Sequence, residues 1–200
     1  MFNSSKIIYI FVALALLAIL SYVVLTQDGG GKYADTIAEK RFVKEKFLRD
    51  SPDSPFKGKA KFKTLAYFQP IEAYKVQARV ELLDKPVPTE VKMSKGETEV
   101  YLCYAYLHFE LSGKKYKLLA LRRKFVDPIL WVGFRDATTG TETYGAGRYL
   151  DLAYRNGQKT VLLDFNLAYN PYCAYNDAFV CPLPPQENIL PVAIQAGEKL

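Results

Sequence analysis

The chain opens with an uninterrupted apolar segment, and this pattern predicts a helix that crosses a membrane. Residues 7–25 carry no charged side chain and are interrupted only by Tyr9, Ser21 and Tyr22. A helix rises about 1.5 Å per residue, so these 19 residues span close to the ~30 Å hydrocarbon core of a bilayer. Residues 23–27 lack the small-residue pattern at which signal peptides are cleaved. We therefore interpret residues 1–27 as an N-terminal transmembrane signal-anchor.

Residues 28–55 predict a glycine hinge followed by a second helix. The three glycines at 29–31 lose much backbone entropy in a helix, so we expect a flexible break there. Residues 33–49 contain no proline or glycine and are rich in Ala, Glu, Lys and Arg, which favours a helix. Their apolar positions form no continuous stripe, so this helix is expected to be largely exposed. The Pro-rich segment 51–55 should end it.

From residue 56 to residue 200 the apolar positions recur with a period of two, which is typical of strands. The clearest alternation lies in 74–82, and 101–111 predicts one continuous apolar row. Further strands are expected near 58–68, 88–93, 115–123, 129–135, 143–154, 160–166 and 189–195. Short strands joined by turns such as 156–157 predict a mainly β domain. Its architecture is expected to be an antiparallel β-barrel or a two-sheet sandwich.

The net charge of +6 is concentrated near the apolar segment. Residues 1–63 carry 11 basic and 6 acidic side chains, whereas residues 64–200 carry 16 and 15. This distribution suits anionic lipid head groups better than nucleic acid, although an ordinary solvated surface explains it too. A row of lysines at 57, 59, 61 and 63 either contacts such phosphates or protects an edge strand from pairing.

The side of the membrane is indicated by two opposing features. Basic residues soon after the apolar segment would by themselves keep the domain in the cytoplasm. A short N-terminal tail, one apolar helix and a large following domain form the usual layout of an export anchor. We expect a single-pass membrane protein with its domain on the exported side, periplasmic or extracellular.

Several reaction classes are excluded by missing motifs. The chain has no Gly-Lys-Ser/Thr phosphate loop and no Gly-x-Ser-x-Gly elbow. Segment 145–148 lacks the third glycine of a dinucleotide fingerprint. His108 lies five residues from Cys103, so strict alternation would place them on opposite strand faces. We therefore predict no metal site and no cofactor, and we assign no catalytic residue.

Polar and conformationally restricted residues gather in a hairpin, 134–150, and in a loop, 164–188. Such segments are typical of binding sites or of structural plugs. The candidate binding residues are Asp136, Glu142, Tyr144, Arg148, Asp164, Asn166, Asn170, Asn188 and Glu198. A buried arginine is costly unless a carboxylate pairs with it, so we expect such a partner for Arg148. The candidates for that partner are Asp136, Glu142 and Asp164.

Two cysteines in the loop are candidates for a disulfide. Cys173 and Cys181 are separated by seven residues, enough for the chain to turn back on itself. An exported domain favours a disulfide between them. The alternative is a pair of thiols used for reaction or metal binding in a cytoplasmic domain. Cys103 is expected to be a buried member of a strand's apolar row.

The motifs of these segments resemble a known family. They are the segments 134–140, 142–150, 164–166, 169–174, 181–188 and 196–199. Together they resemble the bacterial domain-of-unknown-function family numbered 1684, over about residues 38–200. Membership implies no reaction. Tyr172 departs from the pattern, because many members have a second proline at this position.

Three functions remain open. The first is an exported binding or accessory domain that holds a small ligand or a protein partner at 134–150 and 164–188. The second is a hydrolase-like enzyme that uses the motif carboxylates or Cys173. The third is a purely structural role for the motif residues, which would close one end of the β domain.

Overall fold

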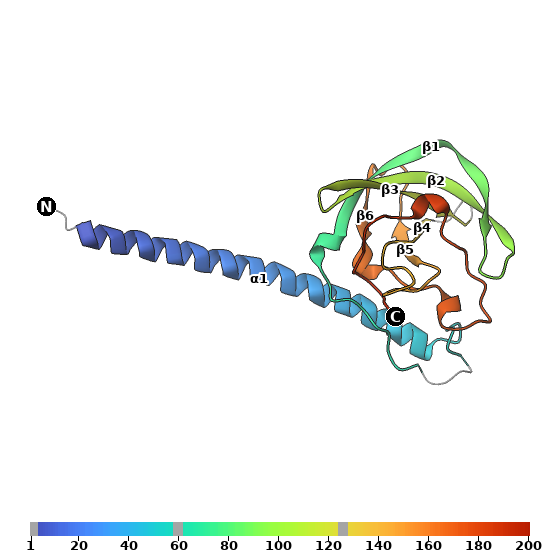
Figure 1. Cartoon of the computed structure of the whole chain (residues 1–200), viewed down its shortest axis with the longest axis horizontal. Helices are drawn as coiled ribbons and strands as arrows, with labels where there is room; N and C mark the ends of the chain where they lie inside the picture. Colours follow the sequence, from blue (N-terminus) through green and yellow to red (C-terminus); the bar gives the residue numbers. More distant parts are fainter. Residues whose placement is uncertain (1–3, 58–61, 124–127) are drawn as a thin grey trace.

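The computed structural model of the chain describes residues 4–57, 62–123 and 128–200, without most side chains before residue 31. Its first element is a long helix, α1 (Ser4–Asp50), which extends away from a β domain (Figure 1). Within the described part of the chain, no helix is both long and apolar enough to cross a membrane. The segment 7–25, for which a membrane helix was predicted, lies in part outside the described side chains.

Helix α1 runs without interruption through residues 29–31, so the structure has no hinge at the glycines where we predicted one. A glycine weakens a helix by only about 1 kcal/mol relative to alanine, and hydrogen-bonded turns continue on both sides. The helix ends at Asp50, just before Pro52, as the sequence predicts. Its last turn is closed by a hydrogen bond from Ser51 N to Phe47 O at 2.9 Å.

One side of the C-terminal half of α1 packs on the β domain, whereas most of its residues are exposed, as the sequence predicts. Tyr33, Ile37 and Leu48 are buried in this contact. The same side of the helix carries Arg41, whose guanidinium donates to the carbonyls of Phe68 and Asn166 at 3.0 and 3.2 Å. The helix therefore binds the β domain through a few buried apolar side chains and through hydrogen bonds, without a continuous apolar stripe.

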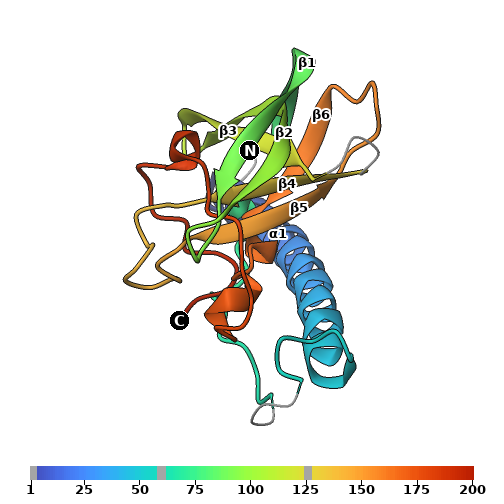
Figure 2. The same ribbon diagram turned by 90° about the vertical axis from the view of Figure 1, so that its right-hand side faces the viewer.

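The β domain is one antiparallel sheet that curls into a nearly closed barrel (Figures 1 and 2). Its strands are β1 (Lys75–Lys92), β2 (Thr98–Leu111), β3 (Lys114–Arg122), β4 (Ile129–Phe134), β5 (Arg148–Ala153) and β6 (Thr160–Asp164). Their order is β5-β4-β3-β2-β1-β6, and the two edge strands contact each other. The barrel prediction is therefore right and the two-sheet alternative is wrong.

A β-bulge divides the apolar row that we predicted along 101–111. The register with β3 shifts between Cys103 and Ala105, so the side chains change faces there. Leu107 and Phe109 pack inside the barrel, whereas Tyr101 and Cys103 pack in a smaller cluster on its outside. Tyr106 joins the Cys103 cluster, so His108 shares that face. Our expectation of opposite faces for Cys103 and His108 is wrong because a bulge breaks strict alternation.

Two of the other predicted strands do not form. Segment 189–195 makes only an isolated bridge, Arg135 with Ile189, and 62–68 makes only the bridge of Tyr67 with Glu198. Segment 88–93 is the end of the long strand β1, and only the second half of 143–154 is a strand. The lysine row is not tested, because residues 58–61 lie outside the described part. The C-terminal segment instead wraps the open end of the barrel, and three short 3-10 helices interrupt it: Phe165–Leu167, Tyr172–Ala174 and Gln186–Asn188.

Candidate functional site

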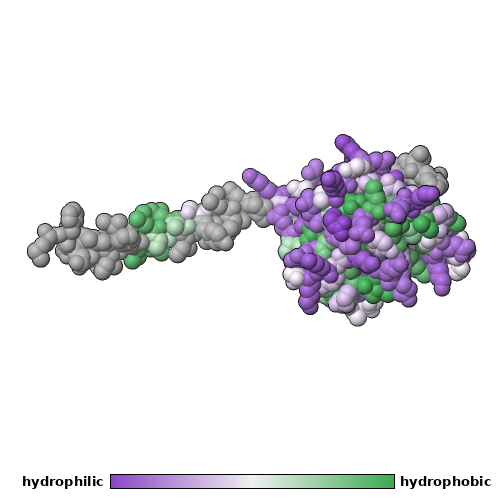
Figure 3. Space-filling view, turned by 90° about the horizontal axis from the view of Figure 1, so that it is seen from above, coloured by the Kyte–Doolittle hydropathy of each residue, from purple (hydrophilic) through white to green (hydrophobic). Residues whose placement is uncertain are grey.

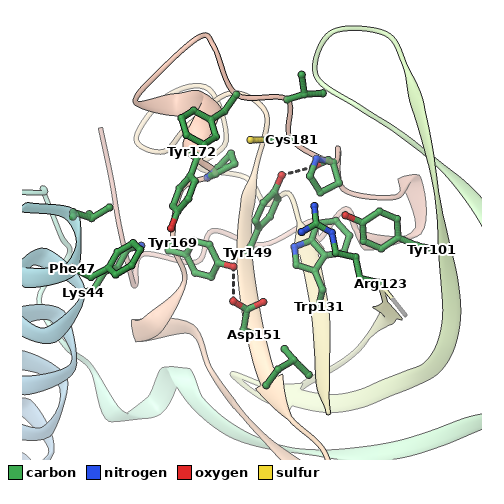
Figure 4. Close-up of a pocket in the computed structure, with 16 residues that line it drawn as sticks. Lys44, Phe47, Tyr101, Arg123, Trp131, Tyr149, Asp151, Tyr169, Tyr172 and Cys181 are labelled. Atoms are coloured by element: carbon green, nitrogen blue, oxygen red, sulfur yellow. Dashed lines mark hydrogen bonds between the residues drawn. The ribbon is translucent and has the colours of Figure 1, made fainter. Parts of the chain in front are cut away.

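A cleft of about 690 Å³ lies on the outer surface of β4 and β5 (Figure 4). One wall is the C-terminal part of α1, and the loop that carries residues 171–182 forms the rim above it (Figure 4). Tyr101 and Arg123 lie across the cleft from α1 (Figure 4). The side chains that line it are Lys44, Phe47, Leu48, Tyr101, Arg123, Ile129, Trp131, Tyr149, Asp151, Tyr169, Pro171, Tyr172, Phe179, Val180, Cys181 and Pro182. Strand alternation explains the aromatic floor, because Leu130 and Leu150 point into the barrel and their neighbours point outward.

Four aromatic rings form a continuous row in the cleft. The ring centroids of Tyr101 and Trp131 are 5.6 Å apart, and those of Trp131 and Tyr149 are 4.9 Å apart. Tyr149 and Tyr169 follow at 5.7 Å. All three spacings are in the range of favourable tilted or edge-to-face ring contacts. The row is therefore held in place by its own members and by the sheet beneath it.

Charged groups lie at the ends and along one side of this row (Figure 4). The Lys44 ammonium lies 4.4 Å from the centre of the Tyr169 ring and pairs with Glu198. Arg123 lies at the Tyr101 end, with its guanidinium 3.8 Å from the Glu99 carboxylate. Asp151 accepts a hydrogen bond of 2.6 Å from the Tyr169 hydroxyl. Burial lowers the pKa of Lys44, and the nearby Glu198 opposes that shift.

The polar motif residues form a different structure, centred on Arg148. Its guanidinium pairs with Asp136 at 2.6 Å, and both side chains are only 1% exposed. It also donates to the carbonyls of Ile194 at 2.8 Å, Glu198 at 3.1 Å and Ala196. This arrangement confirms the prediction of a carboxylate partner for Arg148. Its consequence is structural, because it ties the C-terminal segment to the end of the barrel.

Asp164 and Asn166 join the helix to the sheet. The Tyr33 hydroxyl of α1 donates to Asp164 Oδ1 at 2.8 Å, and Asn166 Nδ2 donates to that hydroxyl at 2.8 Å. Asn166 also exchanges two hydrogen bonds with the backbone of Ile71, at 2.8 and 2.9 Å. Burial, with Asp164 nearby, raises the pKa of Tyr33. These hydrogen bonds therefore hold α1 against the barrel.

Glu198 and Asn188 perform similar tasks at two other places. Glu198 is 1% exposed, and its carboxylate accepts from Lys44, from Tyr175 and, at 2.9 Å, from Asn170 N.

Asn188 inserts between β3 and β4. It accepts from Leu119 N at 2.7 Å and donates to the carbonyls of Leu119 and Gly133 at 2.9 and 2.7 Å. Its side chain therefore replaces part of the ladder between two strands that share one register pair.

None of the nine candidate binding residues lines the cleft. Seven are buried, Glu142 is exposed and contacts Gln195 at 3.1 Å, and the half-buried Tyr144 contacts Cys173. The loop 164–188 contributes to the cleft as expected, but the hairpin 134–150 contributes only Tyr149. The missed signal was one aromatic residue at an outward position of each of two paired strands, Trp131 in β4 and Tyr149 in β5.

The two loop cysteines meet at the rim of the cleft as free thiols, so the predicted disulfide is not formed in the structure. Cys173 N donates to Cys181 Sγ at 3.1 Å, and the Tyr144 hydroxyl donates to Cys173 Sγ at 3.9 Å. The hydrogen bond from Cys181 is the largest influence on Cys173, whose pKa is lowered to about 6. The same interaction raises the pKa of Cys181.

Metal-ligating side chains do not converge in the part of the chain that the structure describes. No group of three His, Cys, Asp or Glu residues there has a suitable arrangement. His108 Nε2 lies 3.0 Å from Glu81 Oε2 at the surface of the barrel.

The comparisons with known proteins agree with the motif resemblance. A family model described as "Protein of unknown function (DUF1684)" matches residues 60–199. A solution NMR structure of the uncharacterized protein from gene locus rrnAC0354 of Haloarcula marismortui is 36% identical, with a TM-score of 0.67. The match covers 86% of this chain and 97% of that one, and its source is an archaeon, so the likeness is not confined to bacteria. No curated protein matches significantly. The chain belongs to the DUF1684 family of proteins of unknown function.

Proposed function

We propose that the domain binds a small, elongated and uncharged ligand in the cleft on the outer face of β4 and β5. The observation that carries this proposal is the continuous row of four aromatic rings, Tyr101, Trp131, Tyr149 and Tyr169, in a cleft of about 690 Å³. Small-molecule sites usually have about 300–1,000 Å³ and a mainly apolar, aromatic lining with few polar groups. The cleft has the expected size and lining.

The charge balance of the cleft favours an uncharged ligand. Lys44 pairs with Glu198, Arg123 approaches Glu99, and Asp151 accepts the Tyr169 hydroxyl. Because both cations already have carboxylate partners, an anionic ligand would have to displace one of them, and it would also meet the negative charge of Asp151. Affinity should therefore come from ring faces and aliphatic surface, at about 25 cal/mol per Å² of apolar area removed from water. Asp151 and the tyrosine hydroxyls would fix the orientation of a ligand that carries hydrogen-bond donors.

The buried motif residues support a structural role beside this site. Asp136, Asp164 and Glu198 are almost fully buried and accept hydrogen bonds within the buried network, and Glu198 also pairs with Lys44 of the cleft wall. A general acid or base has to reach the proton that it transfers. These three carboxylates therefore argue against the hydrolase-like alternative. Their hydrogen bonds favour a structural network that positions α1 beside the cleft.

The single tryptophan provides a direct test, because Trp131 lies in the aromatic row. We would titrate the full chain with uncharged apolar probes, a linear alkyl glycoside and an aromatic glycoside, and follow tryptophan fluorescence. Phe47 lines the cleft and is 41% exposed, whereas Phe42 on the same helix is 62% exposed and outside it. Phe47→Ala should weaken binding about two- to thirteenfold, in line with ~0.5–1.5 kcal/mol for one aromatic contact. Phe42→Ala should not weaken it.

Two results would contradict the proposal. One is an unchanged Trp131 signal at saturating concentrations of every probe. The other is an equal loss of affinity in Phe47→Ala and Phe42→Ala, because it would place the probe on the helix surface instead of in the cleft. The affinity should also depend only weakly on salt concentration, since the proposed ligand carries no charge.

We also propose that residues 7–25 anchor this domain to a membrane, with the domain on the exported side. The support is the charge-free run of 19 residues and the exposure of its described apolar side chains. Val12, Leu14, Leu16 and Leu17 are each more than half exposed. Figure 3 shows an apolar stretch on the extended part of α1, away from the β domain. Carbonate washing should leave the full-length chain in the membrane pellet, and external protease should digest the domain in intact spheroplasts. A shortened chain in the supernatant would argue against the anchor.

A further inference from the structure

We infer that Cys173 and Cys181 are a peroxide-reactive thiol pair, in which the Cys173 thiolate attacks the peroxide first and Cys181 then closes a reversible disulfide. Nothing in the proposed ligand binding requires this chemistry. The inference depends on how the loop brings two thiols and several hydrogen-bond donors together at the rim of the cleft.

The geometry places the two side chains against each other across the loop. Pro171 and Pro182 flank the pair, and the 3-10 helix Tyr172–Ala174 turns the chain back after Cys173. Cys181 Sγ lies 3.1 Å from Cys173 N, so it sits beside the backbone of its partner. Cys181 N in turn donates to Ser94 Oγ at 3.1 Å, which holds the second cysteine to the end of β1. The Cys181 sulfur therefore lies close to the residue with which it would form the disulfide.

The two cysteines have unequal surroundings, and these assign their roles. Cys173 is half-buried and accepts from the Tyr144 hydroxyl, whereas Cys181 is buried. Donors directed at a sulfur favour its anionic form, and the Cys173 pKa of about 6 follows from donors that include Cys181, Tyr144 and Ser94. We therefore assign Cys173, the less buried thiol, which accepts from Tyr144, as the one that reacts first, and Cys181 as the one that closes the disulfide.

The reaction balances with a peroxide as the oxidant. The Cys173 thiolate attacks one peroxide oxygen, the O–O bond breaks, and the departing hydroxide takes up a proton to form water. Cys173 then carries a sulfenic acid. Cys181 loses its proton and attacks the Cys173 sulfur, the S–O bond breaks, and a second water leaves. Two thiols and one hydrogen peroxide become one disulfide and two waters, and an external dithiol reverses the change.

The position of the pair links this reaction to the cleft. Cys181 and Pro182 line the cleft, and the Tyr149 hydroxyl donates to the Pro182 carbonyl. Tyr149 is in edge contact with Trp131 at 4.9 Å. Closing the disulfide should therefore change Trp131 fluorescence even when no ligand is present.

The test uses the full chain, reduced, freed of reductant and then treated with one equivalent of hydrogen peroxide. We expect two of the three thiols to disappear, a peptide map that joins Cys173 to Cys181, and full recovery with dithiothreitol. Cys103 provides the internal control, because it is buried in a separate cluster. Cys173 should react at least about tenfold faster than Cys103.

Three variants separate the steps. Cys181→Ser should leave a sulfenic acid on Cys173 that dimedone traps, whereas Cys173→Ser should give neither disulfide nor trapped adduct. Cys103→Ser should behave as the unmodified chain, and circular dichroism would show that all three variants fold. A disulfide already present after purification and resistant to mild reductant would overturn the inference, as would equal oxidation of all three cysteines. Ligand titration by Trp131 fluorescence is a separate measurement, so failure here leaves the proposed binding function untouched.

Discussion

The buried pair of Arg148 and Asp136 should be the most stability-critical polar contact at the end of the barrel. The two side chains meet at 2.6 Å with 1% exposure each. Asp136→Asn keeps the shape of the side chain but leaves the guanidinium buried without a countercharge. Breaking a buried pair on one side typically costs about 3–5 kcal/mol. Arg148 keeps its carbonyl acceptors at Ile194, Ala196 and Glu198, so we expect the lower end, about 3 kcal/mol.

Urea unfolding of the full chain in mild detergent, followed by Trp131 fluorescence, measures this cost. With an m-value of about 2 kcal/mol per M, the midpoint should fall by about 1.5 M. Glu142→Gln is the matched control, because Glu142 is an acid of the same hairpin whose contact with Gln195 is exposed. Its midpoint should change by less than about 0.5 M.

A double variant tests the mechanism. Adding Arg148→Met to Asp136→Asn removes the uncompensated charge, so the second change should cost less in this background than it does alone. Equal midpoints for Asp136→Asn and Glu142→Gln would refute the reasoning. So would strict additivity of the two changes, because it would show that the pair does not act as a unit.

Three further outcomes follow from individual contacts. In chemical unfolding, Gly147→Ala should destabilise the domain by about 3 kcal/mol, because φ is +95° and a Cβ would lie 2.5 Å from the Phe134 carbonyl oxygen. Gly140 also has a positive φ but has open space around it, so Gly140→Ala should cost only about 1 kcal/mol. Asn188→Ala should cost about 3 kcal/mol in the same assay, since it leaves the Leu119 backbone unpaired. As pH rises from 6 to 9, the reduced chain should become more stable relative to its Cys173→Ser variant, because the Cys173 pKa falls from 9.0 to about 6 on folding. Thermal melting at a series of pH values measures this difference, and a difference that does not grow with pH would contradict the prediction.

The local patterns of the chain predicted its elements well where neighbouring residues decide the structure. The strands predicted at 74–82 and 115–123 largely coincide with parts of β1 and β3, and the prolines after Asp50 follow the end of α1. The prediction failed where long-range contacts decide. Segment 189–195 has strand-like composition, yet Arg148 and Asn188 take up backbone groups that a ladder would have used.

The candidate site shows the same division. The motif segments drew attention to Asp136, Arg148 and Glu198, whose residue types are costly to bury without partners. The sequence therefore indicated that these residues need polar partners, and it predicted a carboxylate partner for Arg148, which is Asp136. The cleft was not predicted, because it depends on α1 lying beside the outer face of β5. Only then do Lys44 and Phe47 come to face Tyr169 and Asp151.

By itself, the sequence determined the class of the domain, because the period of apolar residues follows from the backbone geometry of consecutive positions. It also determined that the polar motif residues needed partners, since their chemistry makes burial alone unfavourable. The tertiary structure decided which partners they have, that Cys173 meets Cys181, and that four rings from three strands and a loop form one row. Contacts between residues far apart in the chain depend on the packing of whole elements, which no local pattern encodes.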